Sequence, residues 1–421
     1  MTTMAIDNKD KKVLKSSIER EQNELACSAE REKIKGSKNL NVPHLRFPEF
    51  SGEWETKSIN DLADVIGGGT PDTTVKSYWD GGIQWFTPSE IGKNKFVDAS
   101  LRTITEDGLN NSSAKLLPPN TILLSSRATI GECSLSLREC ATNQGFQSLV
   151  SKKCNVDFLY YLIQTKKKDL IRKSCGSTFL EISANEVRKI QVSVPSDVEQ
   201  QKIAGLLSLI DKRIATQNKI IEDLKKLKSA IVDKLYSSTN GKTYSFCQLF
   251  EVVNEKNKKL AYKNVLSASQ ELGMIERSNI NIDIKFEQES ISGYKIVRKG
   301  DYVVHLRSFQ GGFAFSDTTG ICSPAYTILR PNDLVVYGYL SHFFTSKPFI
   351  KSLKLVTYGI RDGRSINVDE WLDMPILLPS AQEQMRILTI VNAIDAKLHN
   401  EAKVQFCLSS QKSYLLNTMF I

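Results

Sequence analysis

An internal repeat is the feature that most constrains the fold of this chain. The segment from Ile182 to Leu235 aligns without a gap with the segment that begins at Ile366, 184 residues later. A chance match of this length is improbable, so the chain contains two copies of one unit. The identical positions include Glu186 with Glu370, Pro195-Ser196 with Pro379-Ser380, Glu199-Gln200 with Glu383-Gln384, Ile210-Asp211 with Ile394-Asp395, and Lys228-Ser229 with Lys412-Ser413.

The segments that precede this repeat are related more weakly, at an offset of 180 residues. Residues 119–124 lie over residues 299–304, and Arg127 lies over Arg307. Each block has the pattern of a turn, a buried strand and a polar turn. The sequence therefore predicts an α+β fold, in which two tandem mixed α/β domains are separated by two long helices.

The best preserved part of the repeat predicts these two helices. Each begins after a Pro-Ser pair and carries a glutamate in its first turn. We call the positions at which two such helices would meet the seam; they recur every seven residues from Ile203 and every seven residues from Leu207. Eight of these ten positions are apolar in the first copy, and seven of ten are apolar in the second copy. This pattern is typical of a two-stranded coiled coil, although two amphipathic helices packed on their own domains would also satisfy it. The residues assigned to helix pairing are Ile210, Ile214, Ile221, Lys228, Ile394, Leu398, Glu401 and Leu408.

The polar residues at the seam suggest a register. If the helices are antiparallel and Gln217 faces Lys412, the repeat places Lys228 opposite Glu401. In this register nearly every polar seam residue of one helix faces a polar seam residue of the other, and Lys228 and Glu401 form a pair of opposite charge. A register that separates this pair would leave an unpaired charge between the helices. The alternative is that these polar residues face solvent or a partner protein.

Composition excludes several protein classes. No apolar run approaches the about 18 residues of a membrane span, and residues 1–38 have no apolar signal region. The eight cysteines form no Cys-x-x-Cys pair, and no cysteine and histidine cluster has zinc spacing. We therefore expect a cytoplasmic protein with reduced thiols, no metal and no membrane association. A net charge of +9 suits a nucleic-acid partner but does not require one.

No catalytic motif is found. A phosphate-binding P-loop would need a glycine where Tyr236 stands, five residues before Gly241. The run Gly67-Gly68-Gly69 belongs to no dinucleotide-binding pattern, and we interpret it as a loop that needs the φ freedom of glycine. A Gly-x-Ser-x-Gly elbow is also missing. The chain is therefore predicted to bind rather than to catalyse, without a cofactor of its own.

Loops in both units carry residue types that contact nucleic acids. Arginine pairs with guanine, asparagine and glutamine pair with adenine, and lysine, serine and threonine hold phosphates. Arg127 and Arg307 are favoured as DNA-binding residues because both copies place an arginine just after a buried strand. The candidate DNA contacts are Lys76, Tyr78, Gln84, Thr87, Ser89, Lys93, Lys95, Arg127, Thr129, Asn143 and Gln144 in the first unit, and Ser267, Ser269, Gln270, Arg307, Ser308, Gln310, Arg361 and Arg364 in the second.

Together these features resemble the specificity (S) subunit of type I restriction–modification systems. The similar stretches are Pro43–Glu53, Thr142–Gly145, the two Pro-Ser-x-x-Glu-Gln helix starts, and Tyr358–Ile366. The resemblance covers about residues 42–421. One departure is Ser323-Pro324-Ala325, which stands where the first unit has Asn143-Gln144-Gly145.

The resemblance implies two target-recognition domains, each of which reads one half of a split, asymmetric double-stranded DNA site. It also implies that the helices pair antiparallel with pseudo-two-fold symmetry, as a spacer on which two modification (methyltransferase) subunits dock before restriction (motor nuclease) subunits join. S-adenosylmethionine, ATP and Mg²⁺ are then expected on the partner subunits and not in this chain. The expected parts are a charged N-terminal arm (1–46), target-recognition domain 1 (47–197), a central spacer helix (198–240), target-recognition domain 2 (241–381) and a C-terminal spacer helix (382–421).

Two other functions stay open at this point. One is an enzyme, either a nuclease or a methyltransferase, that acts alone. The other is a non-catalytic coiled-coil scaffold or adhesin without DNA readout. Turnover of DNA by the purified chain with Mg²⁺ and S-adenosylmethionine would support the first, and failure to bind DNA at any salt concentration would support the second.

Overall fold

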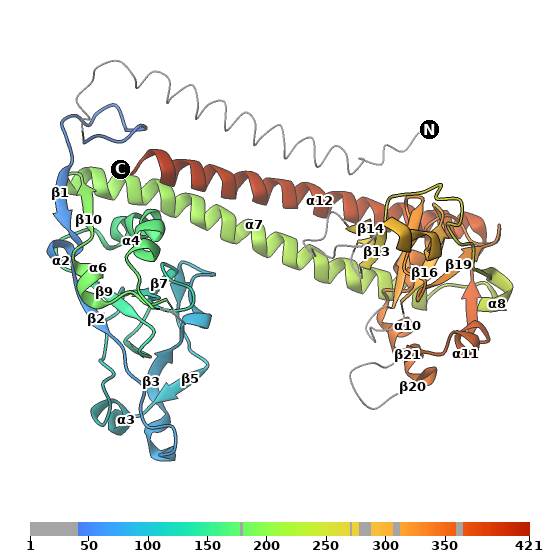
Figure 1. Ribbon diagram of the computed structural model, residues 1–421, viewed down its shortest axis with the longest axis horizontal. Helices are drawn as coiled ribbons and strands as arrows, with labels where there is room; N and C mark the ends of the chain where they lie inside the picture. Colours follow the sequence, from blue (N-terminus) through green and yellow to red (C-terminus); the bar gives the residue numbers. More distant parts are fainter. Residues whose placement is uncertain (1–40, 177–179, 270–271, 278–287, 306–311, 359–364) are drawn as a thin grey trace. The chain divides into compact units, whose positions relative to one another are not determined.

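The chain folds into two compact units (Figure 1). The computed structural model describes residues 41–176, 180–269, 272–277, 288–305, 312–358 and 365–421. Unit 1 consists of the described residues up to Arg213 together with Leu408–Ile421, and unit 2 consists of those from Ile214 to Cys407. Most of the predicted N-terminal arm, residues 1–40, lies outside the described residues.

Unit 1 contains two mixed sheets and a separate strand pair. The pairs β4–β7 and β3–β8 are parallel, and the other strand pairs are antiparallel. The five-stranded sheet has the order β2 (Ala63–Gly67), β9 (Gln147–Ser151), β6 (Ile122–Leu124), β7 (Cys133–Ser136), β4 (Phe96–Val97). The three-stranded sheet has the order β5 (Arg102–Ile104), β3 (Trp79–Phe86), β8 (Cys140–Thr142). The separate pair is β1 (Glu55–Ser58) with β10 (Gln191–Val194). The short helices are α2 (Ile59–Leu62), α3 (Glu106–Asn110), α4 (Val156–Thr165), α5 (Lys167–Arg172) and α6 (Ala184–Arg188), with 3₁₀ turns η2 (Lys76–Tyr78) and η3 (Pro88–Glu90).

Helix α4 is a central part of the unit 1 core. Its N-cap, Asn155, accepts a hydrogen bond from the Phe158 backbone N–H (3.0 Å), and the six residues Phe158–Ile163 are all buried. The ring of Phe158 stacks on Phe420 with centroids 5.3 Å apart, and Trp54 packs edge-on against Phe420. The C-terminal end of the chain is therefore part of this core.

Unit 2 is built from a four-stranded antiparallel sheet and four strand pairs. The sheet has the order β12 (Phe250–Val253), β19 (Thr327–Pro331), β16 (Tyr302–Val304), β17 (Phe313–Phe315). The strand pairs are β11 (Lys242–Ser245) with β22 (Pro375–Leu378), β13 (Leu266–Ser269) with β14 (Gly273–Glu276), β15 (Lys295–Val297) with β18 (Gly320–Cys322), and β20 (Thr357–Tyr358) with β21 (Ser365–Ile366). The short helices are α8 (Phe246–Leu249), α9 (Tyr339–Phe343), α10 (Lys347–Ser352) and α11 (Val368–Leu372), with 3₁₀ turns η5 (Gln288–Gly293) and η6 (Leu353–Leu355). Aromatic rings dominate the core, where Trp371 is fully buried and stacks on Phe246 at 4.2 Å.

The two units share an order of elements. The pair β11–β22 in unit 2 corresponds to β1–β10 in unit 1, and the order β12-β19-β16-β17 corresponds to β2-β9-β6-β7. A capping box opens the helix after the first strand in both units: Asp61 accepts from the Ser58 N–H (2.8 Å), and Gln248 accepts from the Ser245 N–H (2.9 Å). The weaker sequence similarity therefore reflects a shared topology.

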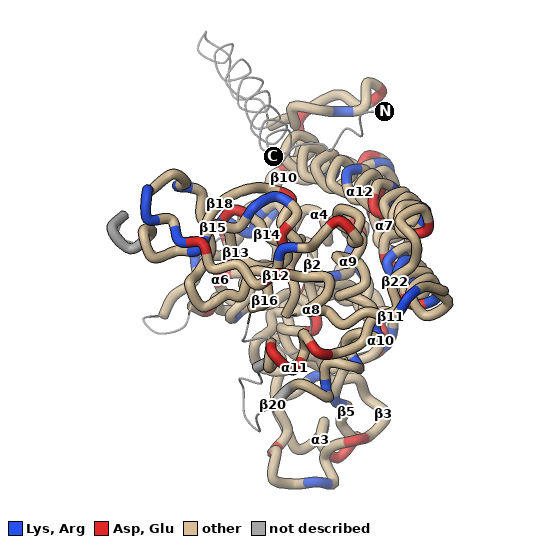
Figure 2. The backbone as a smooth tube through the Cα atoms, turned by 90° about the vertical axis from the view of Figure 1, so that its right-hand side faces the viewer, with Lys and Arg blue, Asp and Glu red and all other residues tan. Residues whose placement is uncertain are grey.

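The two predicted long helices are confirmed as α7 (Asp197–Ser237) and α12 (Ala381–Thr418), of 41 and 38 residues. Every seam position in both helices is buried or half-buried. Basic and acidic residues are interspersed along both helices (Figure 2). At each helix start the Nε2 group of a glutamine, Gln200 or Gln384, donates to the carbonyl of the proline five residues earlier, at 3.0 Å. Among the described residues, no helix is apolar over a length that would cross a membrane.

The register predicted for the two helices is wrong. Within unit 2, Gln217 donates to the Glu401 carboxylate (2.5 Å) and Lys228 pairs with Asp395 (2.5 Å) instead of Glu401. These two contacts run in opposite directions along the chain, so the helices are antiparallel in this unit. Within unit 1, Lys412 pairs with Asp211 at 2.7 Å. The prediction failed because Gln217 meets its own repeat equivalent, Glu401, instead of Lys412, and because each lysine stem reaches an aspartate beside the seam.

Candidate nucleic-acid interface

Four loops of unit 1 meet where strands end. They are residues 68–70, 87–90, 125–129 and 143–145, which follow β2, β3, β6 and β8, and we call them the strand-end loops. Backbone hydrogen bonds hold them together: Gly69 N–H to the Thr142 carbonyl (2.8 Å), Asn143 N–H to Phe86 (3.1 Å), and Ser126 N–H to Gly145 (2.8 Å). This arrangement brings together six predicted DNA contacts from three separate places in the sequence: Thr87, Ser89, Arg127, Thr129, Asn143 and Gln144.

The glycine run before Thr70 is required by close packing. A Cβ on Gly68 would lie 2.0 Å from the Asn143 carbonyl oxygen, and a Cβ on Gly69 would lie 2.3 Å from the Ala114 nitrogen. Neither glycine has a positive φ. The prediction that this loop needs the φ freedom of glycine is therefore wrong, because what it needs is the missing side chain.

Gln144 is exposed, and a neighbouring loop orients its amide. The Thr70 hydroxyl donates to the Gln144 side-chain oxygen (2.5 Å), which leaves the amide nitrogen and a second lone pair available. Asn143 has a different role, because its side-chain oxygen accepts from the Gly145 N–H (2.9 Å) and shapes the turn. An amide held in one orientation can recognise the edge of an adenine.

Arg127 lies at the surface, in the strand-end loop that follows β6. Its guanidinium forms an ion pair with Glu181 (2.8 Å), and the two side chains are 44% and 36% exposed. The next residue, Ala128, has φ 55°, a left-handed conformation that costs about 1–2 kcal/mol in a non-glycine residue. The loop therefore holds Arg127 in place although the local backbone is strained.

Hydroxyl groups complete this surface. Thr87 forms a capping box with Glu90, and its hydroxyl lies 3.1 Å from that of the exposed Ser89. Thr129 is exposed and donates to the Ser125 hydroxyl at 3.1 Å. Lys76 and Lys93 are also exposed, whereas Tyr78 is half-buried against the Trp79 cluster.

Lys95 has an internal role instead of the predicted DNA contact. Its side chain is 9% exposed, and its ammonium contacts Asp157 (2.7 Å), the Tyr161 hydroxyl (3.1 Å) and Ser208 (2.8 Å). These three partners use all three N–H donors of the lysine. The amide oxygen of Gln84 is likewise used inside the unit, by the Ser100 N–H at 2.7 Å.

Few predicted contacts of unit 2 can be located. The Ser267 hydroxyl accepts from Arg277 (3.2 Å), and the Ser269 hydroxyl accepts from the Leu272 N–H (3.3 Å). Both serines are half-buried. Gln270, Arg307, Ser308, Gln310, Arg361 and Arg364 lie outside the described residues.

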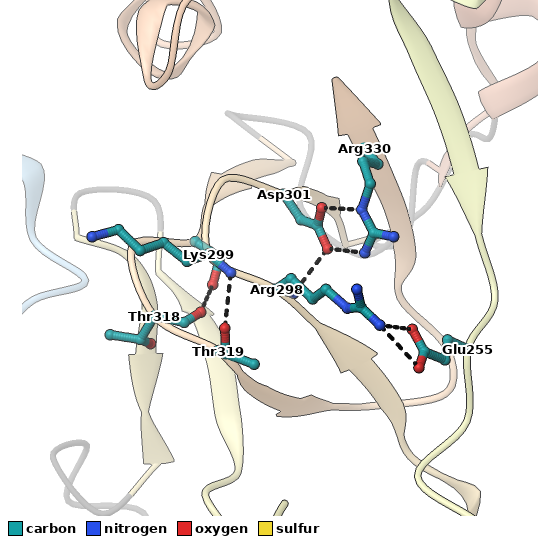
Figure 3. Close-up of polar contacts among 8 residues, drawn as sticks. Glu255, Arg298, Lys299, Asp301, Thr318, Thr319 and Arg330 are labelled. Atoms are coloured by element: carbon teal, nitrogen blue, oxygen red, sulfur yellow. Dashed lines mark hydrogen bonds and ion pairs between the residues drawn. The ribbon is translucent and has the colours of Figure 1, made fainter. Parts of the chain in front are cut away.

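Charged residues of unit 2 stabilise the turn before β16 (Figure 3). The Asp301 carboxylate, 2% exposed, accepts from two nitrogens of Arg330 at 2.9 Å and from the Arg298 backbone N–H at 2.8 Å. The hydrogen bond to Asp301 raises the pKa of Arg330. The side chain of Arg298 turns to Glu255 at 3.0 Å. These cations are engaged in the fold.

Among the described residues, no group of three or more histidine, cysteine or acidic side chains could hold a metal ion. Burial raises the pKa of the Cys133, Cys140 and Cys322 thiols to about 12, which keeps them protonated and poorly nucleophilic at neutral pH.

Sequence reasoning missed two residues that orient the candidate contacts. Thr70 follows the glycine run, but the sequence does not show that its hydroxyl faces Gln144. Glu181 lies on a different segment from Arg127, and the two meet only because the chain forms a β-bridge between them. Only the fold identifies these partners.

Comparison with known proteins places these features in context. Residues 51–226 match the family model described as "Type I restriction modification DNA specificity domain". The chain is 39% identical over 180 residues to the type I restriction enzyme MjaIX specificity subunit of Methanocaldococcus jannaschii, covering 42% of each protein. It is 31% identical over 188 residues to the EcoR124I/EcoR124II specificity subunit of Escherichia coli, covering 43% of this chain and 45% of that one. These matches span less than half the length of the two relatives.

The fold is similar to a solved structure over almost its whole length. The crystal structure of a type I restriction-modification system S subunit from M. genitalium superposes with a TM-score of 0.51. The match covers 90% of this chain and 99% of that chain at 15% sequence identity, so it concerns the fold.

Proposed function

We propose that the chain is the DNA-specificity subunit of a type I restriction–modification system, the family whose specificity domain residues 51–226 match. It binds double-stranded DNA and selects the sequence at which partner subunits act. It is not an enzyme by itself. S-adenosylmethionine, ATP and Mg²⁺ are used by the partner subunits.

One observation carries this proposal: a single chain contains two units of the same strand order whose loops differ. A symmetric dimer of identical readers recognises a palindrome. Two fused readers that have diverged can recognise two different half-sites, so the DNA site becomes bipartite and asymmetric. Residues 47–197 then form target-recognition domain 1 and residues 241–381 form target-recognition domain 2.

The polar contacts of the long helices support a pseudo-two-fold relation between the copies. The repeat maps Asp211 onto Asp395 and Lys412 onto Lys228, so the ion pairs in the two units are equivalent. It also maps Gln217 onto Glu401, and these two residues bond to each other.

We further propose that α7 and α12 act as a spacer and as the docking surface for two methyltransferase subunits, which restriction subunits then join. A helix of about 40 residues spans about 60 Å, which exceeds the about 34–36 Å of one DNA turn. Large apolar side chains are exposed along both helices, and such side chains favour protein contacts. They include Leu209, Leu227, Val404, Phe406 and Tyr414.

In unit 1 the strand-end loops are the proposed recognition surface. Arg127 pairs with guanine and Gln144 with adenine, because both are exposed and held in fixed orientations by Glu181 and Thr70. Exposed Lys76, Lys93, Ser89 and Thr129 contact phosphates. In unit 2, Arg307 and Arg361 are assigned from the sequence alone.

Exchange of one reader tests this proposal. Residues 47–180 are replaced by those of another family member, and the adenine methylation of the host genome is sequenced. Only one half of the methylated site should change, and the matched exchange in the second unit should change only the other half. A change in both halves contradicts the assignment of one unit to one half-site. Methylation that is unaffected by deleting the chain contradicts the proposed function itself.

A further inference from the structure

The loop that follows β12 in unit 2 is unusually basic. Residues 256–263 contain four lysines and no acidic residue. All four lysines are exposed, and none forms an ion pair with a described side chain. The nearest acidic residue in the sequence, Glu255, is paired with Arg298 at 3.0 Å. The lysines are Lys256, Lys258, Lys259 and Lys263.

A buried asparagine closes this loop, which we call the lysine loop. Asn257 is 1% exposed. Its side chain donates to the Tyr262 carbonyl (2.8 Å) and accepts from the Tyr262 N–H (3.2 Å), while its backbone N–H donates to Tyr294 (2.9 Å). These bonds fix both ends of the segment that carries Lys258 and Lys259. The loop is therefore a shaped element of the fold.

The tip of the lysine loop has an unfavourable backbone conformation. Leu260 has φ 52° and is 49% exposed, although leucine strongly disfavours the left-handed region. Its N–H donates to the Asn257 carbonyl at 2.9 Å, which maintains the turn. Strained residues held by their surroundings are frequent in binding loops. A lysine-rich stretch that served only solubility would not need this fixed shape.

Packing attaches the lysine loop to the core of unit 2. Lys256 forms a β-bridge with Lys295 of β15, and the Ile296 N–H donates to the Glu255 carbonyl at 2.7 Å. The ammonium of Lys295 is engaged with the Tyr326 carbonyl (2.7 Å). The four lysines, which form no ion pair with a described side chain, are thus attached to the core of unit 2 through these backbone contacts.

We propose that the lysine loop binds the sugar–phosphate backbone of the DNA, with the four ammonium groups contacting phosphates. Lysine ammonium groups are the side chains that bind phosphates as point charges, and a preformed loop loses little entropy on binding. The loop anchors unit 2 on the duplex regardless of base sequence. This inference rests on the proposed function and adds to it a phosphate-binding site that the sequence analysis did not assign.

The salt dependence of DNA affinity tests the inference. The full chain, assembled with its methyltransferase subunits, is titrated with a random-sequence duplex and with a duplex that contains its methylation site, from low to high salt. Each lost phosphate contact lowers the slope of log K against log salt by about 0.9. The variants K258Q/K259Q and K256Q/K263Q should therefore each lower the slope by about 2, equally for both duplexes, without changing which site is methylated.

The matched control removes two charges elsewhere in unit 2. Lys351 and Lys354 are exposed and lie outside the lysine loop and the long helices, and K351Q/K354Q should leave the slope unchanged. Loop variants that keep the wild-type slope, or a control that lowers it equally, overturn the inference while the proposed function stands. A wild-type assembly that binds neither duplex overturns the proposed function. Thermal unfolding of each variant excludes a folding defect as the cause.

Discussion

Units 1 and 2 begin their sheets in the same way and then differ in the first loop. β2 and β12 are the edge strands of sheets with a common strand order. After β2, Gly68 and Gly69 press their backbone against neighbouring loops, whereas after β12 the chain forms the lysine loop. A scaffold that keeps its strand order while its loops diverge is the usual arrangement of proteins that bind many targets. The strand framework and the loops therefore have separate constraints.

A second difference lies in the turn before the central strand. In unit 1 the Thr121 hydroxyl donates to the Pro118 carbonyl at 2.6 Å. In unit 2 the equivalent position is Asp301, which is buried and binds Arg330 with two hydrogen bonds. The same turn is therefore held by a neutral hydrogen bond in one unit and by a charge pair in the other.

Removing Arg330 should give the largest effect and should act on unit 2 alone. Arg330→Ala leaves the Asp301 carboxylate buried without its partner, which should lower the free energy of unfolding by about 3 kcal/mol. This value is near the lower limit for breaking a buried ion pair, because Arg330 is 30% exposed. Hydrogen exchange resolved to the peptides of β16 and β19 measures the loss. The control Thr121→Ala should cost only about 1 kcal/mol, and in unit 1. Equal losses from the two substitutions would remove this difference between the units.

Filling the space at Gly68 should damage unit 1 alone. Gly68→Ala places a Cβ 2.0 Å from the Asn143 carbonyl oxygen, so the strand-end loops must separate at a cost of about 1–3 kcal/mol. Methylation should fall at sites that depend on the unit 1 half-site. Gly82 is the control because nothing lies within 4 Å of a Cβ added there. A normal methylation pattern in Gly68→Ala would show that the close packing of these loops is not needed for recognition.

Truncating the two oriented side chains should weaken one half-site. Arg127→Ala and Gln144→Ala should each cost about 1–3 kcal/mol of specific binding and relax base preference in one half only. Arg138→Ala is the control, because Arg138 is also an exposed arginine of unit 1 and pairs with Asp98 at 2.7 Å. A uniform loss on all sequences, with a salt slope lower by about one, would instead assign Arg127 to a phosphate.

The framework was more predictable than the surface. The long helices were predictable from the apolar residues that recur every seven positions from Ile203 and from Leu207, because residues buried along one side of a helix recur at a regular spacing in the sequence. The shared turns and strands followed from the repeat. The register failed because Lys228 and Lys412 reach acidic residues beside the seam, and a one-dimensional pattern contains no side-chain reach.

The candidate contacts were predictable as residue types but not as partners. The side chains of Arg127 and Gln144 are accessible at the surface, whereas Lys95 has the same local sequence character and is enclosed by Asp157, Tyr161 and Ser208. Burial depends on contacts between segments far apart in the sequence, as does the pairing of Arg127 with Glu181. The lysine loop was visible as a charge run, but its fixed shape depends on the burial of Asn257.

A titrating residue should make the pH dependence of the two units different. Unit 2 has His342 next to Lys228 and Asp395, where burial and the lysine charge lower its pKa. Because the pKa in the folded state lies below that in the unfolded state, protonation favours unfolding, and unit 2 should lose stability as pH falls through the ordinary range of histidine near 6.5. His342→Gln should flatten this dependence in unit 2 without changing unit 1. An unchanged pH profile would show that other groups control it.

The smallest effect concerns the equivalent ion pairs of the long helices. In unit 1, Asp211 and Lys412 are 16% and 20% exposed, and Asp211 also accepts from the Tyr161 hydroxyl at 2.6 Å. In unit 2, Asp395 and Lys228 are 38% and 26% exposed, and His342 stands 3.9 Å from Asp395. Ion pairs near the surface contribute about 0.2–1 kcal/mol, and burial with a second hydrogen bond increases the coupling. Double-mutant cycles with asparagine and methionine should therefore give a larger coupling for Asp211–Lys412 than for Asp395–Lys228. The reverse order would mean that desolvation of Asp211 outweighs its additional hydrogen bond.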